Sequence, residues 1–148
     1  MWFSRKQIEK PSGDKPAESG QITTKRLGDE AEAAALAFLA KAGLKLVERN
    51  YRTPGRGGGE IDLIMRDADG TLVFVEVRRR ASTSHGGAAA SIGSVKQQRI
   101  IFAARSYLTR WASPPPCRFD VVLVNGALSD GNTPPASIEW LTAAFDAS

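Results

Sequence analysis

The segment from Gly59 to Arg80, GEIDLIMRDADGTLVFVEVRRR, constrains the fold of this chain more than any other. Its apolar residues form two runs, and the polar stretch between them ends in Asp69-Gly70. Glycine supplies the positive φ that a tight hairpin turn requires at this position. We therefore predict two antiparallel strands joined by a three-residue loop, with Asp67 facing Thr71.

This register places two acidic side chains opposite each other. Counting back along the strands, Asp62 faces Glu76 and Glu60 faces Arg78, on one face of the sheet because side chains alternate with a period of two. Like charges opposed in a sheet destabilise it, and a divalent cation between them would remove the repulsion. Oxygen ligands without cysteine or histidine suit Mg²⁺ or Mn²⁺ better than Zn²⁺. We predict a metal site at Asp62 and Glu76.

Two alternatives to a metal site stay open at this point. The acids of the hairpin could lie on a solvated face and pair only with arginine side chains. The register could also be shifted by one residue, which would turn Asp62 and Glu76 toward opposite faces and separate them.

Positive charge concentrates around the hairpin. Residues 49–110 hold eleven Lys or Arg and five Asp or Glu, a net charge of +6, whereas the whole chain carries +4. A positive field around a carboxylate cluster favours a polyanionic substrate held through its phosphates, and few aromatic residues are interleaved for reading bases. The cations expected to contact nucleic acid are Arg56, Arg79, Arg80, Lys96 and Arg99.

A helix and a strand are expected before the hairpin. Apolar residues three and four positions apart predict an amphipathic helix from Lys25 to Ala42, with a buried stripe of Leu27, Ala31, Ala34, Ala35, Phe38 and Ala42. Glu30 lies beside this stripe, so its side chain could reach the hairpin or face solvent. A strand at Leu44–Arg52 follows, and the loop at residues 53–59 is too rich in glycine for regular structure.

Four further elements are expected after the hairpin. A second helix runs from about Ser94 to Trp111 and carries Lys96 and Arg99 in its first turns. Arg118–Val124 is an almost continuous apolar strand, and its position after a helix implies parallel pairing with the hairpin. Residues 138–141 are predicted as an edge strand and 142–148 as a helical end. The order α-β-β-β-α-β-β indicates an α/β fold, a mixed sheet flanked by helices.

Composition limits the compartment and the number of domains. Residues 1–26 have no apolar periodicity and carry six basic and three acidic residues, so we expect a disordered basic tail before a single domain at 27–148. No apolar run approaches the roughly 18–20 residues of a membrane span, and no signal-peptide core follows Met1. A single cysteine, Cys117, fits a reducing cytoplasm.

Six motifs in this order make the chain similar to a known family. It resembles the YraN family of small bacterial proteins over residues 26–146, and through it the restriction-endonuclease-like PD-(D/E)xK nucleases, especially archaeal Holliday-junction resolvases. The motifs are Leu27–Glu32, Glu48–Arg52, Gly59–Ile64, Val73–Arg78, Ser91–Lys96 and Arg118–Val122.

The resemblance implies a restriction-endonuclease-like fold and a Mg²⁺- or Mn²⁺-dependent endonuclease acting on structured or branched DNA as a homodimer. It implies that Asp62 and Glu76 bind the metal, that Arg78 stands at the third catalytic position, and that Glu30 and Glu60 are auxiliary acids.

Arg78 is a departure from the nuclease pattern, which ends in lysine. Arginine keeps the charge and can clamp a phosphate, but its pKa is too high for a general base. Lys96 could supply the missing ammonium group. The alternatives are a catalytically inactive nucleic-acid-binding protein that keeps the nuclease fold, and a scaffold protein whose acids only form ion pairs.

Overall fold

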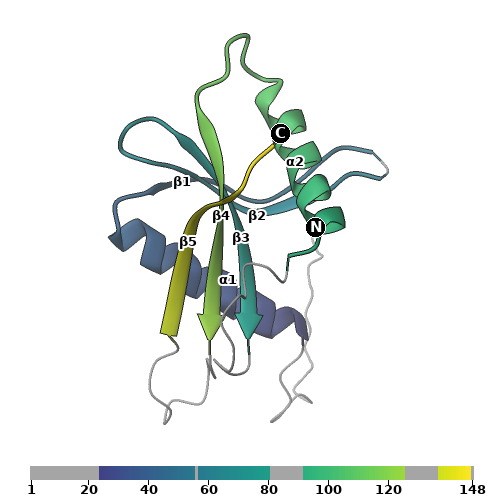
Figure 1. Ribbon diagram of the computed structural model, residues 1–148. Helices are drawn as coiled ribbons and strands as arrows, with labels where there is room; N and C mark the ends of the chain where they lie inside the picture. Colours follow the sequence, from purple (N-terminus) through teal and green to yellow (C-terminus); the bar gives the residue numbers. More distant parts are fainter. Residues whose placement is uncertain (1–23, 56, 81–91, 126–136, 148) are drawn as a thin grey trace, which may run out of the picture.

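Two helices and five strands make up the part of the chain that the computed structural model describes, residues 24–55, 57–80, 92–125 and 137–147 (Figure 1). They follow each other in the predicted order, which confirms the mixed α/β fold class. The elements are α1 (Thr24–Lys41), β1 (Lys45–Arg52), β2 (Glu60–Arg66), β3 (Leu72–Arg80), α2 (Ser94–Leu108), β4 (Cys117–Asn125) and β5 (Ser137–Phe145).

The strands form one sheet in the order β1-β2-β3-β4-β5. Only β3 and β4 are parallel, as expected for two strands joined by a crossover through α2. In the β2–β3 hairpin the Asp67 N–H donates to the Thr71 carbonyl at 2.9 Å, and Gly70 has a φ of 93°. The pairs Leu63–Val75 and Ile64–Phe74 continue that register, which confirms the predicted hairpin and its turn as far as Leu63–Val75. The predicted pairs Asp62–Glu76 and Glu60–Arg78 lie beyond this paired stretch, and Glu60 pairs with Arg52 of β1 instead.

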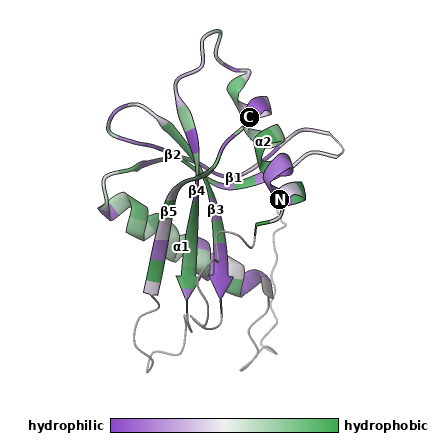
Figure 2. Ribbon diagram, in the orientation of Figure 1, coloured by the Kyte–Doolittle hydropathy of each residue, from purple (hydrophilic) through white to green (hydrophobic). Residues whose placement is uncertain are grey.

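Each helix covers one face of the sheet (Figure 1). On one face, α2 packs Ile100, Ala103 and Tyr107 against apolar side chains of β2 and β3, including Ile64 and Phe74. On the other face, α1 packs against a second cluster formed by Leu63, Met65, Val73, Val75, Val122 and Val124. In Figure 2 most of β4 is hydrophobic, as suits a buried strand, whereas the end of β3 is hydrophilic.

The buried stripe of α1 differs from the predicted one. The residues of α1 with almost no exposure are Ala31, Ala35 and Leu39, whereas Phe38 is 37% exposed and its ring makes a T-shaped contact with that of Trp140. The helix is therefore rotated about its axis relative to the prediction. This rotation changes which acidic side chains of α1 lie next to the buried stripe. The helix begins at Thr24, one residue before its predicted start at Lys25, and residues 1–23 of the expected tail lie outside the described residues.

A buried aspartate ties β4 to β5. Asp120 is completely buried and accepts hydrogen bonds from Arg118 Nε at 3.0 Å, Trp140 Nε1 at 2.9 Å and the Ala143 N–H at 2.8 Å. The Ala143 bond spans an irregularity where the β4–β5 register shifts. The strand therefore continues to Phe145, and the predicted helical end at 142–148 is wrong where the structure describes it.

No helix in the described part of the chain is both long and apolar enough to cross a membrane.

Candidate active site

The hairpin splits at the end away from its turn. Paired residues join β2 to β3 only from Arg66–Leu72 to Leu63–Val75, beyond which β2 pairs with β1 and β3 pairs with β4. Figure 1 shows β1 and β2 running across the direction of β3 and β4. At the split, Asp62 Oδ2 accepts a hydrogen bond from the Val77 N–H at 2.8 Å. A side-chain carboxylate thus replaces a main-chain partner and is fixed between the strands.

Glu76 lies beside Asp62, as the extended register requires. The Glu76 side chain is only 6% exposed, and burial, followed by the charge of Asp62, raises its pKa to about 8. Burial also raises the pKa of Asp62, against the opposing effects of the Val77 N–H and the charge of Lys96. A side-chain hydrogen bond between the two carboxyl groups raises the pKa of Glu76 and lowers that of Asp62, so the protonation of each acid depends on the other.

A third acid, Glu32 of α1, lies near enough to Asp62 for its pKa to respond to the charge of Asp62. Burial raises its pKa to about 7, and the charges of Asp62 and Asp29 add to the effect. Its Oε1 atom is buried without a hydrogen-bond partner among the described residues. The sequence prediction had selected Glu30, which instead forms an ion pair with Arg26 at 3.4 Å, although one of its oxygens is also buried without a partner.

The rotation of α1 explains why Glu32 was missed. At about 100° per residue, a stripe centred on Ala35 leaves Glu32 roughly 60° and Glu30 roughly 140° from its centre. The predicted stripe, which included Phe38 in place of Leu39, placed the two acids at similar angles. Glu32 could have been identified if Leu39 rather than Phe38 had been taken as the buried residue of the stripe. The sequence alone does not decide between these two residues.

Cations border the acids on two sides. Lys96 Nζ lies 3.6 Å from Glu76 Oε2, and the charge of Arg78 lowers the pKa of the same carboxyl. Glu60 forms an ion pair with Arg52 at 3.4 Å, and its charge acts on Asp62. The structure therefore gathers the predicted residues Asp62, Glu76, Arg78 and Lys96, with Glu60 at the margin.

The remaining predicted cations are distributed differently. Arg99 lines a neighbouring cleft, and Arg79 is exposed at the end of β3. Arg80 is turned toward the sheet, where its Nε donates to Asn125 at 2.8 Å and its Nη2 lies 3.6 Å from Glu139. Arg56 lies outside the described residues.

The donor set suits a hard divalent cation. Asp62, Glu76 and Glu32 supply only oxygen atoms, one of them buried without a partner, and all three carboxyl groups have raised pKa values that a cation would lower. Within the described ranges, no three acidic, histidine or cysteine side chains already stand at metal-binding spacing. The Asp62–Glu76 pair is thus the core of the candidate site, and Glu32, whose pKa responds to the charge of Asp62, is the nearest further acid of α1 that could join it.

Fold and site together define a small mixed α/β protein whose sheet splits at a buried acidic cluster flanked by cations. The chain belongs to the uncharacterised protein family UPF0102, which matches residues 31–124 and confirms the resemblance to the YraN family.

The chain is similar to members of this family over most or all of its length. It is 69% identical to a UPF0102 protein of Polaromonas sp. (strain JS666) and 67% identical to one of Polaromonas naphthalenivorans, in both cases across the whole of both chains. A UPF0102 protein of Cupriavidus taiwanensis is 54% identical over 81% of this chain and 82% of its own.

Among solved structures, the chain is similar to a repair endonuclease from Pyrococcus abyssi. The TM-score is 0.37 and the sequence identity 24%, with 67% of this chain and 39% of the other covered.

Proposed function

We propose that this protein is a cytoplasmic, metal-dependent endonuclease that binds structured or branched DNA, with Mg²⁺ or Mn²⁺ held by Asp62 and Glu76. One observation carries the proposal. The hairpin splits where Asp62 accepts the Val77 N–H, and this fixes its carboxyl beside the buried carboxyl of Glu76.

The burial of this acid pair is costly for the fold. Because folding raises the pKa of Glu76 from 4.5 to about 8, ionising this carboxyl group destabilises the folded state by a few kcal/mol, to order of magnitude. An ordinary sheet would place apolar side chains at Asp62 and Glu76. Strained or desolvated acids of this kind cluster at functional sites, which supports a catalytic role for the pair.

The chain's own cations suit the chemistry of phosphodiester hydrolysis. A bound divalent cation would neutralise the scissile phosphate and lower the pKa of an attacking water. Arg78 and Lys96 would stabilise the negative charge that develops on the phosphate. Because Arg78 cannot give up its proton, Lys96 is the amine available beside the acids in the described part of the chain.

Cleavage of labelled DNA tests the proposal. Four-way junctions and linear duplexes are incubated with Mn²⁺, with Mg²⁺ or with EDTA. We expect metal-dependent cleavage of junctions and a loss of about 100-fold or more in Asp62→Asn, because the pair loses its fixed charge. The matched control is Glu48→Gln, which removes a charge from β1 at a surface ion pair with Arg110. Cleavage by Asp62→Asn at the wild-type rate would refute the proposal.

A catalytically inactive nucleic-acid-binding protein, or a scaffold of the same fold, is the second candidate. Arg78 stands where the nuclease pattern has lysine, and the Lys96–Glu76 ion pair offsets one buried charge without any metal. This candidate predicts DNA binding that weakens steeply with salt and no cleavage with any divalent metal. A scaffold without a nucleic-acid role predicts neither.

A further inference from the structure

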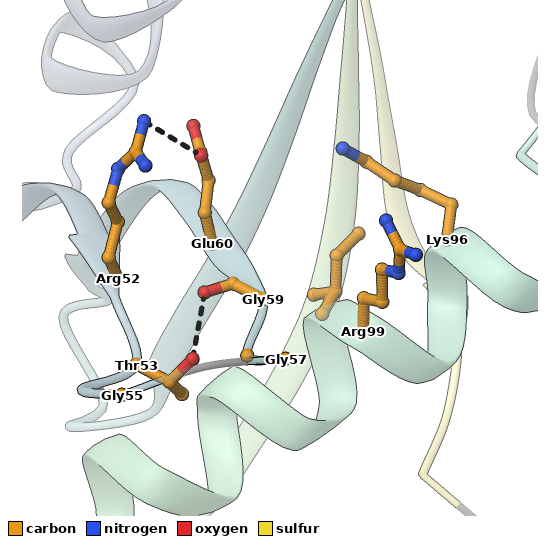
Figure 3. Close-up of a pocket in the computed structure, with 10 residues that line it drawn as sticks. Arg52, Thr53, Gly55, Gly57, Gly59, Glu60, Lys96 and Arg99 are labelled. Carbon is orange, nitrogen blue, oxygen red and sulfur yellow. Dashed lines mark hydrogen bonds and ion pairs between the residues drawn. The ribbon is translucent and has the colours of Figure 1, made fainter.

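A cleft of about 320 Å³ lies between the glycine-rich loop at residues 53–59 and the start of α2 (Figure 3). Figure 3 shows Arg52 and Glu60 on one side of it, Lys96 and Arg99 on the other, and the loop at its base. We call it the glycine-loop cleft. It adjoins the acid pair, because Lys96 lines the cleft and also contacts Glu76.

Four of the five described loop residues that line the cleft are glycines, so most of its base is main chain. Both the N–H and the Oγ1 of Thr53 donate to the Gly59 carbonyl, at 3.1 and 3.2 Å, which closes the loop on itself. A Cβ at Gly59 would overlap the main-chain carbonyl of Arg99, and a Cβ at Gly58 would overlap the Thr53 side chain. Both glycines are therefore required where they stand, and the loop packs directly on α2.

Positive charge exceeds negative charge among the residues of the cleft that the structure describes. Arg52, Lys96 and Arg99 face a single acid, Glu60. Arg52 pairs with Glu60 at 3.4 Å and Lys96 with Glu76 at 3.6 Å, whereas the side chain of Arg99 has no ion pair or hydrogen bond within the described residues. Lys96 and Arg99 are three residues apart on α2 and thus lie on one side of the helix.

We propose that the glycine-loop cleft binds one phosphate group of a nucleic-acid strand through Arg99 and Lys96, with Arg52 on the opposite wall. A guanidinium group binds phosphate oxygens in a bidentate manner, and an arginine side chain without an ion pair beside a wall made mostly of glycine lets a phosphate approach closely. Because Lys96 both lines the cleft and contacts Glu76, the phosphate bound here would neighbour the scissile phosphate at Asp62 and Glu76. The inference rests on nucleic acid being the ligand, and it needs neither metal nor cleavage.

Nuclear magnetic resonance of the full chain tests where the phosphate binds. The ¹⁵N-labelled protein is titrated with a short single-stranded thymidine oligonucleotide in EDTA. We expect saturable shifts of the amide signals of Gly58, Gly59 and the first turns of α2. Shifts confined to the other side of the sheet, or none at all, would overturn the inference.

A pair of variants on α2 tests the role of Arg99. Oligonucleotide affinity is measured by fluorescence anisotropy in EDTA at several salt concentrations. Arg99→Gln is expected to lower the slope of log K against log[salt] by about 0.7, the value for one single-strand phosphate contact. Arg105→Gln removes the same charge from the same helix outside this cleft, where Arg105 Nη2 donates to the Ala147 carbonyl at 3.3 Å, and should leave the slope unchanged.

The two proposals fail in different ways. Equal slopes for Arg99→Gln and the wild type would overturn the phosphate site even if the protein cleaves DNA. The absence of cleavage with every metal, together with a reduced slope in Arg99→Gln, would overturn the nuclease proposal and leave the phosphate site standing.

Discussion

At the scale of single residues, the raised pKa values of Glu76 and Glu32 determine how stability depends on pH. Their pKa values rise from 4.5 to about 8 and about 7 on folding, so the folded chain binds more protons than the unfolded chain between these limits. Stability therefore falls as pH rises from about 4.5 and levels off above about 8. This is the reverse of the usual contribution of a salt-bridged carboxylate.

Urea unfolding in EDTA at pH 5, 6, 7 and 8 measures this dependence. We expect the midpoint to fall between pH 5 and 8 in the wild type and to fall less in Glu76→Gln, which has no charge to bury. A wild-type midpoint that rises over this interval, or an unchanged slope in the variant, would contradict the raised pKa values of Glu76 and Glu32.

Glu32 and Glu30 of α1 provide a matched test of which acid on this helix binds the metal. If Mn²⁺ binds the cluster, it should stabilise the fold by about 2.7 kcal/mol at a free concentration near 100 times Kd. Glu32→Gln should weaken Mn²⁺ binding by at least about 10-fold, whereas Glu30→Gln, which alters the ion pair with Arg26, should leave it close to wild type. Thermal unfolding with increasing Mn²⁺ measures both; equal effects of the two variants would remove Glu32 from the site.

At the scale of elements, the Asp120 network holds the edge of the sheet. Asp120→Ala would leave Arg118, Trp140 Nε1 and the Ala143 N–H without their common acceptor at a fully buried position. We expect a loss of about 3–5 kcal/mol in the free energy of unfolding. Asp29→Ala, which removes only the exposed pair with Lys25, should cost less than about 1 kcal/mol.

Urea titration of the two variants at one pH makes the comparison. Far-ultraviolet circular dichroism confirms that each variant is folded before its midpoint is read. A cost for Asp120→Ala no larger than that for Asp29→Ala would show that β5 is held by its apolar contacts alone.

At the scale of the whole molecule, the proposed nuclease would act as a two-fold dimer, as the resemblance to junction resolvases implies. A dimer would place two acid clusters on one branched substrate. Light scattering during gel filtration should give twice the mass of one chain. When wild-type subunits are mixed with an excess of Asp62→Asn subunits, junctions should be nicked on one strand rather than cut on two. A monomeric mass at every concentration would exclude the dimer.

Much of the site was predictable because its determinants are local. The turn at Asp69-Gly70 and the alternation along β2 and β3 predict that Asp62 and Glu76 lie together, and the two acids do interact just beyond the last pair, Leu63–Val75. The apolar run of β4 and its position after α2 likewise predict the parallel pairing with β3. In each case the residues that specify an element lie within that element or within a few residues of it.

The sequence by itself thus determined the order of elements, the hairpin register as far as Leu63–Val75, and the proximity of Asp62 to Glu76. Tertiary structure alone decided that α1 turns Glu32 rather than Glu30 toward them, that Asn125 and Glu139 engage Arg80, and that Asp120 extends β5 through Ala143. The physical reason is that these outcomes depend on which of several similar side chains packs best against segments distant in the sequence. Periodicity and turn chemistry carry no information about that choice.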